Sequence, residues 1–160
     1  MERAIRSRRT HKQYGVEPVA EALVRELLDV ARFAPNHKLT NPWRFRLLGP
    51  QTRTRVEKLA GEKEAAKLRR APTLVLATAV LSEDPALAEE DVLATGCAVY
   101  AVLLAATARG LASYWRTPPA AVAALAPGER PVALIHLGPR ISEPPPKERL
   151  AVSDVLTVLP

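Results

Sequence analysis

Apolar and polar residues alternate along the chain in a way that predicts helices interleaved with strands. Apolar residues recur at helical spacing between positions 21 and 34, with Glu and Arg between them. Pro50 suits the first turn of another helix, and Asp84-Pro85 has the form of an N-cap followed by a first-turn proline. Gly110 suits a left-handed C-terminal cap. The predicted helices cover residues 2–8, 21–34, 50–59 and 86–109, with a charged helical stretch at 62–71 and a short helix between 117 and 128.

Apolar runs between these helices predict strands. Residues 44–48 are expected to form a buried strand. Residues 73–80, with the sequence TLVLATAV, are typical of a central strand covered on both faces. Further strands are predicted at 111–116 and 130–138, and His136 in the last is expected to be a core histidine rather than a catalyst. Sequence alone thus indicates a mixed α/β domain.

The second half of the helix over 86–109 is apolar nearly all round. Such a helix must be covered on every side, and a chain of 160 residues has little with which to wrap it. We therefore expect part of it to meet another subunit, where Gly96, Ala98 and Ala101 would allow a close helix approach. Cys97 is predicted to be a small core residue, because nothing near it in the sequence would activate it as a nucleophile.

The composition favours one soluble domain, residues 1–160. Apolar residues make up 48% of the chain, which provides a sizeable core. A single cysteine excludes a disulfide framework within the chain, and the three histidines lie too far apart in sequence for a metal site. The basic N-terminus has no apolar run behind it, and the nearly apolar run 93–108 is shorter than the ~20 residues that cross a bilayer. We expect a cytoplasmic protein with no membrane partner and no metal.

The net charge of +6 raises nucleic acid as a partner. Positive charge is dense only near the N-terminus, where Arg8, Arg9 and Lys12 surround the hydroxyl of Thr10. Guanidinium forks, an ammonium group and a hydroxyl together suit a phosphate, although a solvated basic tail would carry the same residues. Aromatic residues that could stack on bases are few. An anionic ligand therefore explains the cluster as well as nucleic acid would, and we expect no nucleic-acid partner.

A polar loop between the second predicted helix and the first strand is another candidate site. Pro35 and Pro42 bound it and resist helix formation, and most residues between them are polar or charged. Trp43 adds a large apolar anchor. A short, stiff loop of this kind is either a ligand-contacting element or an ordinary surface connection.

Segments spread along the chain match, in order, the motifs of one family. The matching segments are Arg8-x-Thr10-x-Lys12, Ala34-Pro35-Asn36-His37-Lys38 followed by Asn41-Pro42-Trp43-Arg44-Phe45, the stretch from Gly110 to Thr117, and Leu137-Gly138 with Lys147 and Arg149. The chain thus resembles the flavin-dependent nitroreductases, and within them a small subfamily that carries Ala-Pro-Asp-His-Lys. The resemblance covers nearly the whole chain.

The resemblance implies an α+β fold with a mainly antiparallel central sheet flanked by helices, and an interlocked homodimer. It implies FMN as the cofactor, with the phosphate held by side chains from both ends of the chain: Arg8, Arg9, Thr10, Lys12, Lys147 and Arg149. Asn36, His37 and Leu39 would reach the flavin, in this family from the partner subunit. The backbone that carries Trp115, Arg116 and Thr117 would run beside the flavin ring.

The activity implied by the resemblance is that of an FMN-dependent oxidoreductase. It would pass a hydride from NADH or NADPH through flavin N5 to a nitroaromatic, a quinone or a similar small aromatic electron acceptor. No catalytic side chain is assigned firmly, and His37 is the candidate for a hydrogen bond or a proton to the substrate. The sequence contains no GxGxxG, P-loop, GxSxG or HExxH motif, which agrees with reactive atoms that belong to a cofactor.

The chain departs from the family pattern at some positions. Leu39 stands where most members have Asn, so a side-chain hydrogen bond to the flavin is missing, and Asn41 replaces Gln. Little sequence between Leu59 and Pro72 is available for a substrate lid, which predicts an open and unselective site. Two alternatives stay open: a basic module that binds nucleic acid or another polyanion without redox chemistry, and a flavin-dependent dehydrogenase of another substrate.

Overall fold

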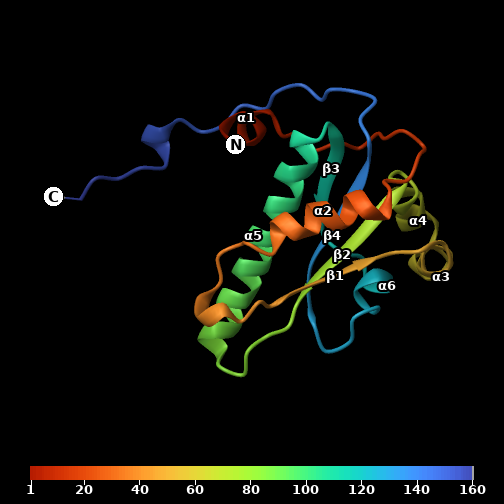
Figure 1. Cartoon of the computed structure of the whole chain (residues 1–160), viewed down its shortest axis with the longest axis horizontal. Helices are drawn as coiled ribbons and strands as arrows, with labels where there is room; N and C mark the ends of the chain where they lie inside the picture. The colour runs from red at the N-terminus through yellow and green to blue at the C-terminus, as the bar shows by residue number, and fades with distance from the viewer. Residues whose placement is uncertain (160) are drawn as a thin grey trace.

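A four-stranded antiparallel sheet runs through the middle of the protein (Figure 1). The structure is a computed structural model, and it describes residues 1–159. The strands β1 (Trp43–Leu47), β2 (Thr73–Ala79), β3 (Leu111–Arg116) and β4 (Arg130–Pro139) have the spatial order β1-β2-β4-β3. The helices are α1 (Glu2–Ser7), α2 (Glu21–Ala31), α3 (Pro50–Ala60), α4 (Glu62–Leu68), α5 (Pro85–Ala108) and α6 (Ala120–Ala123), with the 3-10 turns η1 (His37–Leu39) and η2 (Val152–Asp154).

β2 is the central strand that the sequence predicts at 73–80. All seven of its residues are buried, because β1 and β4 pair with it on either side and helices cover both faces. Successive side chains point to opposite faces of a strand. Val75 and Ala77 accordingly enter one core, and Leu74 and Leu76 enter the other.

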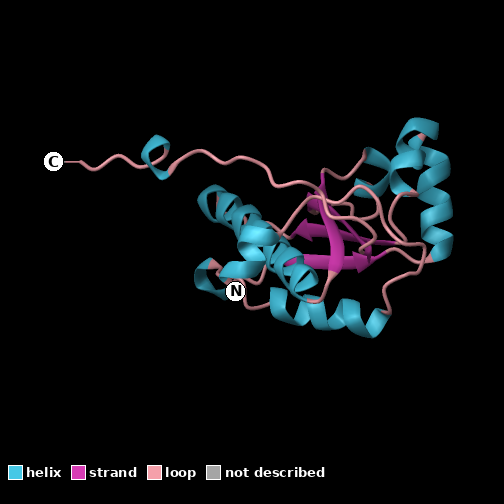
Figure 2. Ribbon diagram, turned by 90° about the horizontal axis from the view of Figure 1, so that it is seen from above, coloured by secondary structure: helices cyan, strands magenta, loops and turns pink. Residues whose placement is uncertain are grey.

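Two helical layers enclose the sheet, as the view from above shows (Figure 2). α2 and α5 cover one face, where Val24 and Leu27 of α2 pack with Val102 of α5. α3, α4 and α6 cover the other face, where Val56, Leu68 and Val122 share a second core.

α5 begins and ends where the sequence indicates. The carboxylate of Asp84 accepts a hydrogen bond from the backbone N–H of Ala86 at 2.9 Å, and Gly110 follows the helix with φ +73°. The helix is 24 residues long and apolar enough to cross a membrane by length and composition. Buried core helices also have this property, and half of the most apolar part of this helix is buried inside the structure.

Two predictions about burial are wrong. Cys97 is exposed on α5 rather than part of the core, because the buried residues of this helix, such as Ala98 and Val102, lie on its other side. β1 is only partly buried, with Arg44 and Leu47 exposed, because it forms an edge of the sheet and pairs with β2 alone.

The chain leaves the body of the fold after β4. Residues 140–159, which we call the C-terminal arm, pass beside α1 and then extend away from the other elements, as both ribbon views show (Figures 1 and 2). The arm carries exposed apolar side chains, among them Ile141 at 63%, Leu150 at 74%, Val155 at 69% and Leu159 at 81% of full exposure.

Candidate functional site

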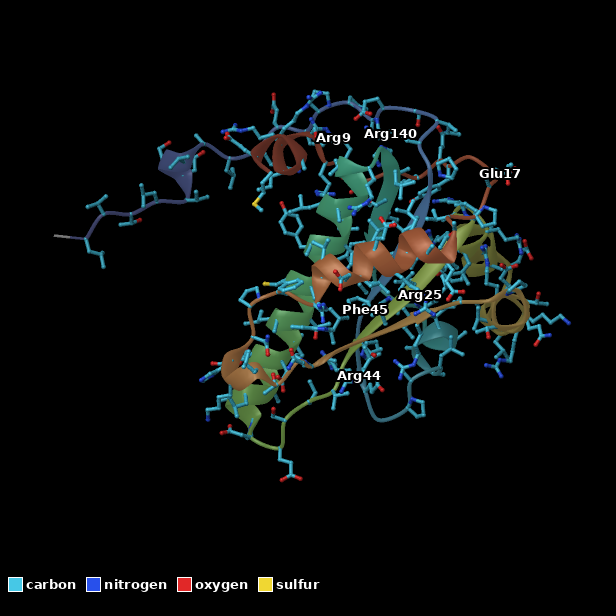
Figure 3. The ribbon with its side chains drawn as sticks, viewed as in Figure 1. Arg9, Glu17, Arg25, Arg44, Phe45 and Arg140 are labelled. Atoms are coloured by element: carbon cyan, nitrogen blue, oxygen red, sulfur yellow. The ribbon has the colours of Figure 1, made fainter. Side chains whose placement is uncertain are left out.

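Cationic side chains from both ends of the chain meet around one hollow of about 500 Å³, which we call the terminal hollow. Arg8 and Arg9 follow α1, and Lys147 and Arg149 come from the C-terminal arm; Ile5, Arg6 and Tyr100 complete the lining, and no lining residue is acidic. The guanidinium of Arg9 donates to the backbone carbonyls of Arg6 at 2.7 Å and Arg8 at 3.0 Å, which fixes it in place. Figure 3 shows Arg9 at the end of the molecule opposite Arg44. An anion with several oxygens suits this hollow.

A second pocket of about 190 Å³, the α4 pocket, lies between the N-terminal segment, α4 and the strands β3 and β4. Four cationic residues contribute to its lining, which consists of Lys12, Lys67, Arg70 and Arg116 with Tyr14, Tyr114 and His136. The structure thus separates Lys12 from Arg8 and Arg9, although the sequence predicts that all three hold one phosphate. Thr10 is exposed and lines neither cavity.

One acid offsets part of the positive charge at the α4 pocket. Glu64 accepts a hydrogen bond from Lys67 at 2.5 Å and another from Arg116. The Lys67 hydrogen bond is the main cause that holds the pKa of Glu64 below its ordinary value, with the charge of Arg116 adding to it. The second guanidinium nitrogen of Arg116, Nη1, is buried without a hydrogen-bond partner. A buried donor without a partner is costly, so this pocket is suited to an acceptor.

His136 lies at the wall of the α4 pocket and is 2% exposed. Its Nε2 has no hydrogen-bond partner. Burial, and then the charges of Arg116, Arg53 and Arg70, lower its pKa to about 3, so the imidazole is neutral at ordinary pH. The side chain packs between the rings of Tyr14 and Tyr114, at centroid distances of 6.4 and 5.6 Å. His136 is a core histidine, as predicted, and it also faces a cationic cavity.

The loop from 36 to 41 adopts a strained backbone. Lys38, Leu39 and Asn41 have φ values of 49°, 53° and 46°, in the left-handed region that side chains with a Cβ disfavour. Each such residue costs about 1 kcal/mol or more. Within the loop, the Asn36 carboxamide oxygen accepts from the backbone N–H of Asn41 at 2.9 Å. Strain of this kind concentrates at functional sites, where the surrounding structure holds it.

Two consecutive acids of α5 hold this loop against the helix. The His37 Nδ1 lies 2.5 Å from a carboxylate oxygen of Glu90, and the Thr40 hydroxyl donates to Asp91 at 2.7 Å. Around the first contact is a hollow of about 380 Å³, the loop hollow, lined by Pro35, Asn36, His37, Glu90, Leu93 and Ala94. The Nδ1 contact leaves the Nε2 of His37, an exposed side chain, free for a ligand. Leu39 projects from the loop with 77% exposure.

The end of β3 completes the set of predicted residues. The Trp115 indole N–H donates to the carbonyl of Val132 at 3.3 Å, and a Cβ added at Gly96 would lie 3.4 Å from the Trp115 ring. Gly96 thus lies beside this ring within the chain, and its predicted role in a close helix approach to another subunit stays a prediction. Arg116 enters the α4 pocket, and Thr117 is exposed just after the strand.

An exposed stripe of α5 connects the loop hollow with the terminal hollow. Glu90 and Leu93 line the first, Tyr100 lines the second, and Cys97 is exposed between them. Ten residues of helix span about 15 Å, so the two hollows lie on one side of α5 at the separation of a medium-sized ligand.

Known proteins share this fold and part of the sequence. Residues 5–66 match the model of the nitroreductase family. Over 96% of this chain and 91% of the relative, the sequence is 27% identical to YfhC of Bacillus subtilis, which is named as a candidate NAD(P)H nitroreductase. The crystal structure of a nitroreductase-like family protein from Bacillus cereus matches 99% of this chain and 95% of its own, with a TM-score of 0.87 and 23% identity. The chain is nitroreductase-like.

A further solved structure similar to this nitroreductase-like chain is that of a candidate nitroreductase from Desulfovibrio desulfuricans, in complex with FMN. It has a TM-score of 0.81 and 24% identity, and the match covers 99% of this chain and 96% of the other. The resemblance to the nitroreductase family and the predicted antiparallel fold are therefore confirmed. The subfamily with Ala-Pro-Asp-His-Lys stays a prediction.

The sequence did not indicate several of the residues that line these cavities. Lys67 belongs to a charged helix that reads as solvated, yet its ammonium group lines the α4 pocket. Tyr14, Arg70 and Tyr114 line the same pocket and carry no motif of their own. In the sequence Asp91 resembles the other polar residues of its helix, and only the folded structure shows that its side chain is buried. The alternation of side chains along β3 is the one local signal that pairs Tyr114 with Arg116.

Proposed function

We propose that this nitroreductase-like protein is an FMN-dependent oxidoreductase that uses NADH or NADPH to reduce small aromatic electron acceptors such as quinones or nitroaromatics. The observation that carries the proposal is the terminal hollow, where Arg8 and Arg9 meet Lys147 and Arg149 with no acid among the lining residues. Two segments about 140 positions apart in sequence supply this charge. A site for a dianionic phosphate requires several cationic donors of this kind.

The residues present fit FMN. The terminal hollow supplies guanidinium and ammonium donors for a phosphate, and the α4 pocket offers a buried Arg116 nitrogen that lacks an acceptor. When bound, FMN would supply the hydride chemistry, taking a hydride from the nicotinamide and passing it to the acceptor. The protein's own part is to bind, to orient and to provide positive charge where negative charge develops.

Each hollow has a separate task in this proposal. Arg8, Arg9, Lys147 and Arg149 anchor the phosphate. Lys12, Lys67 and Arg116 place positive charge in the α4 pocket, which favours a ligand edge that becomes negative on reduction. His37, with its Nε2 free, offers a hydrogen bond or a proton to an oxygen of the acceptor.

We further propose that the active form is a homodimer. The exposed stripe of α5 includes Leu93 at 64% and Tyr100 at 38% exposure, and the C-terminal arm carries exposed apolar side chains away from its own fold. A second copy would bury both surfaces and bring the loop from 36 to 41 of one protomer to the flavin of the other.

A cofactor test decides the main proposal. The purified chain, supplied with FMN, should be yellow and should bleach when NADH or NADPH is added without oxygen. Arg8→Ala combined with Arg149→Ala should lose the flavin, whereas Arg25→Ala, at an exposed arginine that pairs with Glu21 on α2, should retain it. A colourless protein that takes up no FMN and binds DNA in a salt-dependent manner would instead support the basic binding module.

A further inference from the structure

Asp91 is a buried carboxylate whose charge no cation offsets. It is 3% exposed on α5, and none of the ion pairs formed within residues 1–159 includes it. Burial alone would raise the pKa of Asp91, but hydrogen bonds from Ser82 and Thr40 outweigh it and lower the pKa below its ordinary value. A buried, ionised group without a counter-ion costs stability, so its presence needs a reason.

Three donors converge on this carboxylate. One oxygen accepts from the Thr40 hydroxyl at 2.7 Å, and the other accepts from the backbone N–H of Ser82 at 2.8 Å and from its hydroxyl at 2.7 Å. An ionised aspartate accepts from all three donors as they stand. An asparagine could keep both Ser82 donors on its single oxygen and turn its NH₂ group to Thr40, whose hydroxyl would then act as the acceptor.

The Thr40 bond is the buried attachment of an otherwise exposed loop. Residues 37–41 are all exposed, so packing does not determine their conformation. The other side-chain bonds of this stretch are exposed: Asn36 and Asn41 bond within the loop, His37 bonds Glu90, and the guanidinium of Arg44 donates to the Asn41 carbonyl at 2.9 Å. Yet three of these residues hold left-handed φ values. A contact with the rest of the fold is needed to keep the loop in this strained conformation, and the hydrogen bond to Asp91 provides one.

We propose that Asp91 is a positioning residue: through Thr40 it fixes the strained 36–41 loop, and so sets where His37 and Leu39 stand towards the ligand. The inference rests on the proposed function for the identity of the ligand. The restraint itself is a property of the chain alone. Ser82, which precedes α5, ties the turn after β2 to the same carboxylate, so loop, turn and helix meet at one charge.

Amide hydrogen exchange tests the restraint without any cofactor. Thr40 and Asn41 have hydrogen-bonded amides in the loop, and exchange there is measured by NMR in the full-length chain. Asp91→Ala and Thr40→Val should each speed exchange of these two amides at least tenfold, and the double variant should add little to the loop effect because both remove the bond between Thr40 and Asp91. Thr40→Ser keeps the hydroxyl and should restore slow exchange. Glu89→Ala, the corresponding truncation of an acid at an exposed site of α5, is the matched control.

The position of the ligand is tested separately in the FMN-loaded protein. Thr40→Val should raise the KM for a small quinone about tenfold while kcat changes less than threefold, and Thr40→Ser should return KM to the wild-type value. Unchanged loop exchange in both Asp91→Ala and Thr40→Val would overturn the proposal. Equal loss of protection in β2 and in the loop would also overturn it, because Asp91 would then stabilise the fold as a whole. If the wild-type chain binds no FMN, the proposed function fails while the exchange result still decides the restraint.

Discussion

Acid should destabilise this protein through His136 at a pH where carboxylates are still ionised. The imidazole is 2% exposed, and burial together with nearby arginines lowers its pKa from 6.5 to about 3. The folded chain therefore binds fewer protons than the unfolded chain between these two values. The free energy of unfolding is at its full value above pH 6.5 and falls as the pH is lowered towards 3.

The size of the effect follows from the shift. Each pH unit below 6.5 removes about 1.4 kcal/mol, so going from pH 7 to pH 4.5 should lower the free energy of unfolding by about 2.7 kcal/mol. Burial also lowers the pKa of His11, which adds loss in the same direction. Glu64, Asp91, Glu129 and Glu143 have lowered pKa values, so their contributions to stability are full above the ordinary carboxylate pKa and begin to fade as the pH falls to it, near 4.5 for glutamate.

Urea unfolding at half-unit steps from pH 7 to pH 4.5 measures this slope. In His136→Phe, which keeps an aromatic ring between Tyr14 and Tyr114, the slope should shrink to the part due to His11. An undiminished slope in His136→Phe would show that the histidine titrates normally and that the pocket is open to water.

Three further outcomes can be measured directly. Gly138→Ala should lower the free energy of unfolding by about 1–3 kcal/mol, because its Cβ would lie 2.8 Å from the ring of Pro72, whereas Gly49→Ala meets nothing within 4 Å and should be near neutral in urea unfolding. Glu129→Gln should cost about 1–2 kcal/mol, because it breaks a two-bond pair with Arg46 that is partly screened by solvent. Removal of the C-terminal arm should yield a monomer without flavin in sedimentation and absorbance, and a yellow dimer would contradict its assigned role.

Local signals were strong enough to predict the main elements. A continuous apolar run identified β2, and the aspartate cap and the glycine after the helix gave the two ends of α5 within a residue. These signals depend on neighbouring residues only. The basic motifs at Arg8 and at Arg149 could also be recognised in the sequence, because cationic residues next to a hydroxyl or to prolines do not fit a helical pattern.

What the sequence could not predict depends on which side of an element faces the core. α5 is apolar on nearly every side, so nothing local distinguishes exposed Cys97 from buried Ala98. Likewise, nothing in the sequence distinguishes Lys67 from the other charged residues of α4. Only the fold shows that Lys67 lines the same pocket as Arg116 of β3 and His136 of β4. The family resemblance assigns Lys12 and Arg8 to one phosphate; in the single chain Lys12 lines the α4 pocket and Arg8 lines the terminal hollow, so the shared assignment stays a prediction.

The homodimer proposed above would account for the exposed surfaces of the single chain together. The stripe of α5 is apolar at Leu93 and Tyr100, and it runs between the hollow beside His37 and the hollow beside Arg149. A partner that covers the stripe would close both hollows at once and give the C-terminal arm a surface to lie on. The 36–41 loop, held by Asp91 instead of by packing, would then already have its bound shape before the partner arrives. Preorganisation of this kind reduces the entropy lost on assembly, and in the proposed homodimer that gain would offset the cost of burying a carboxylate without a counter-ion.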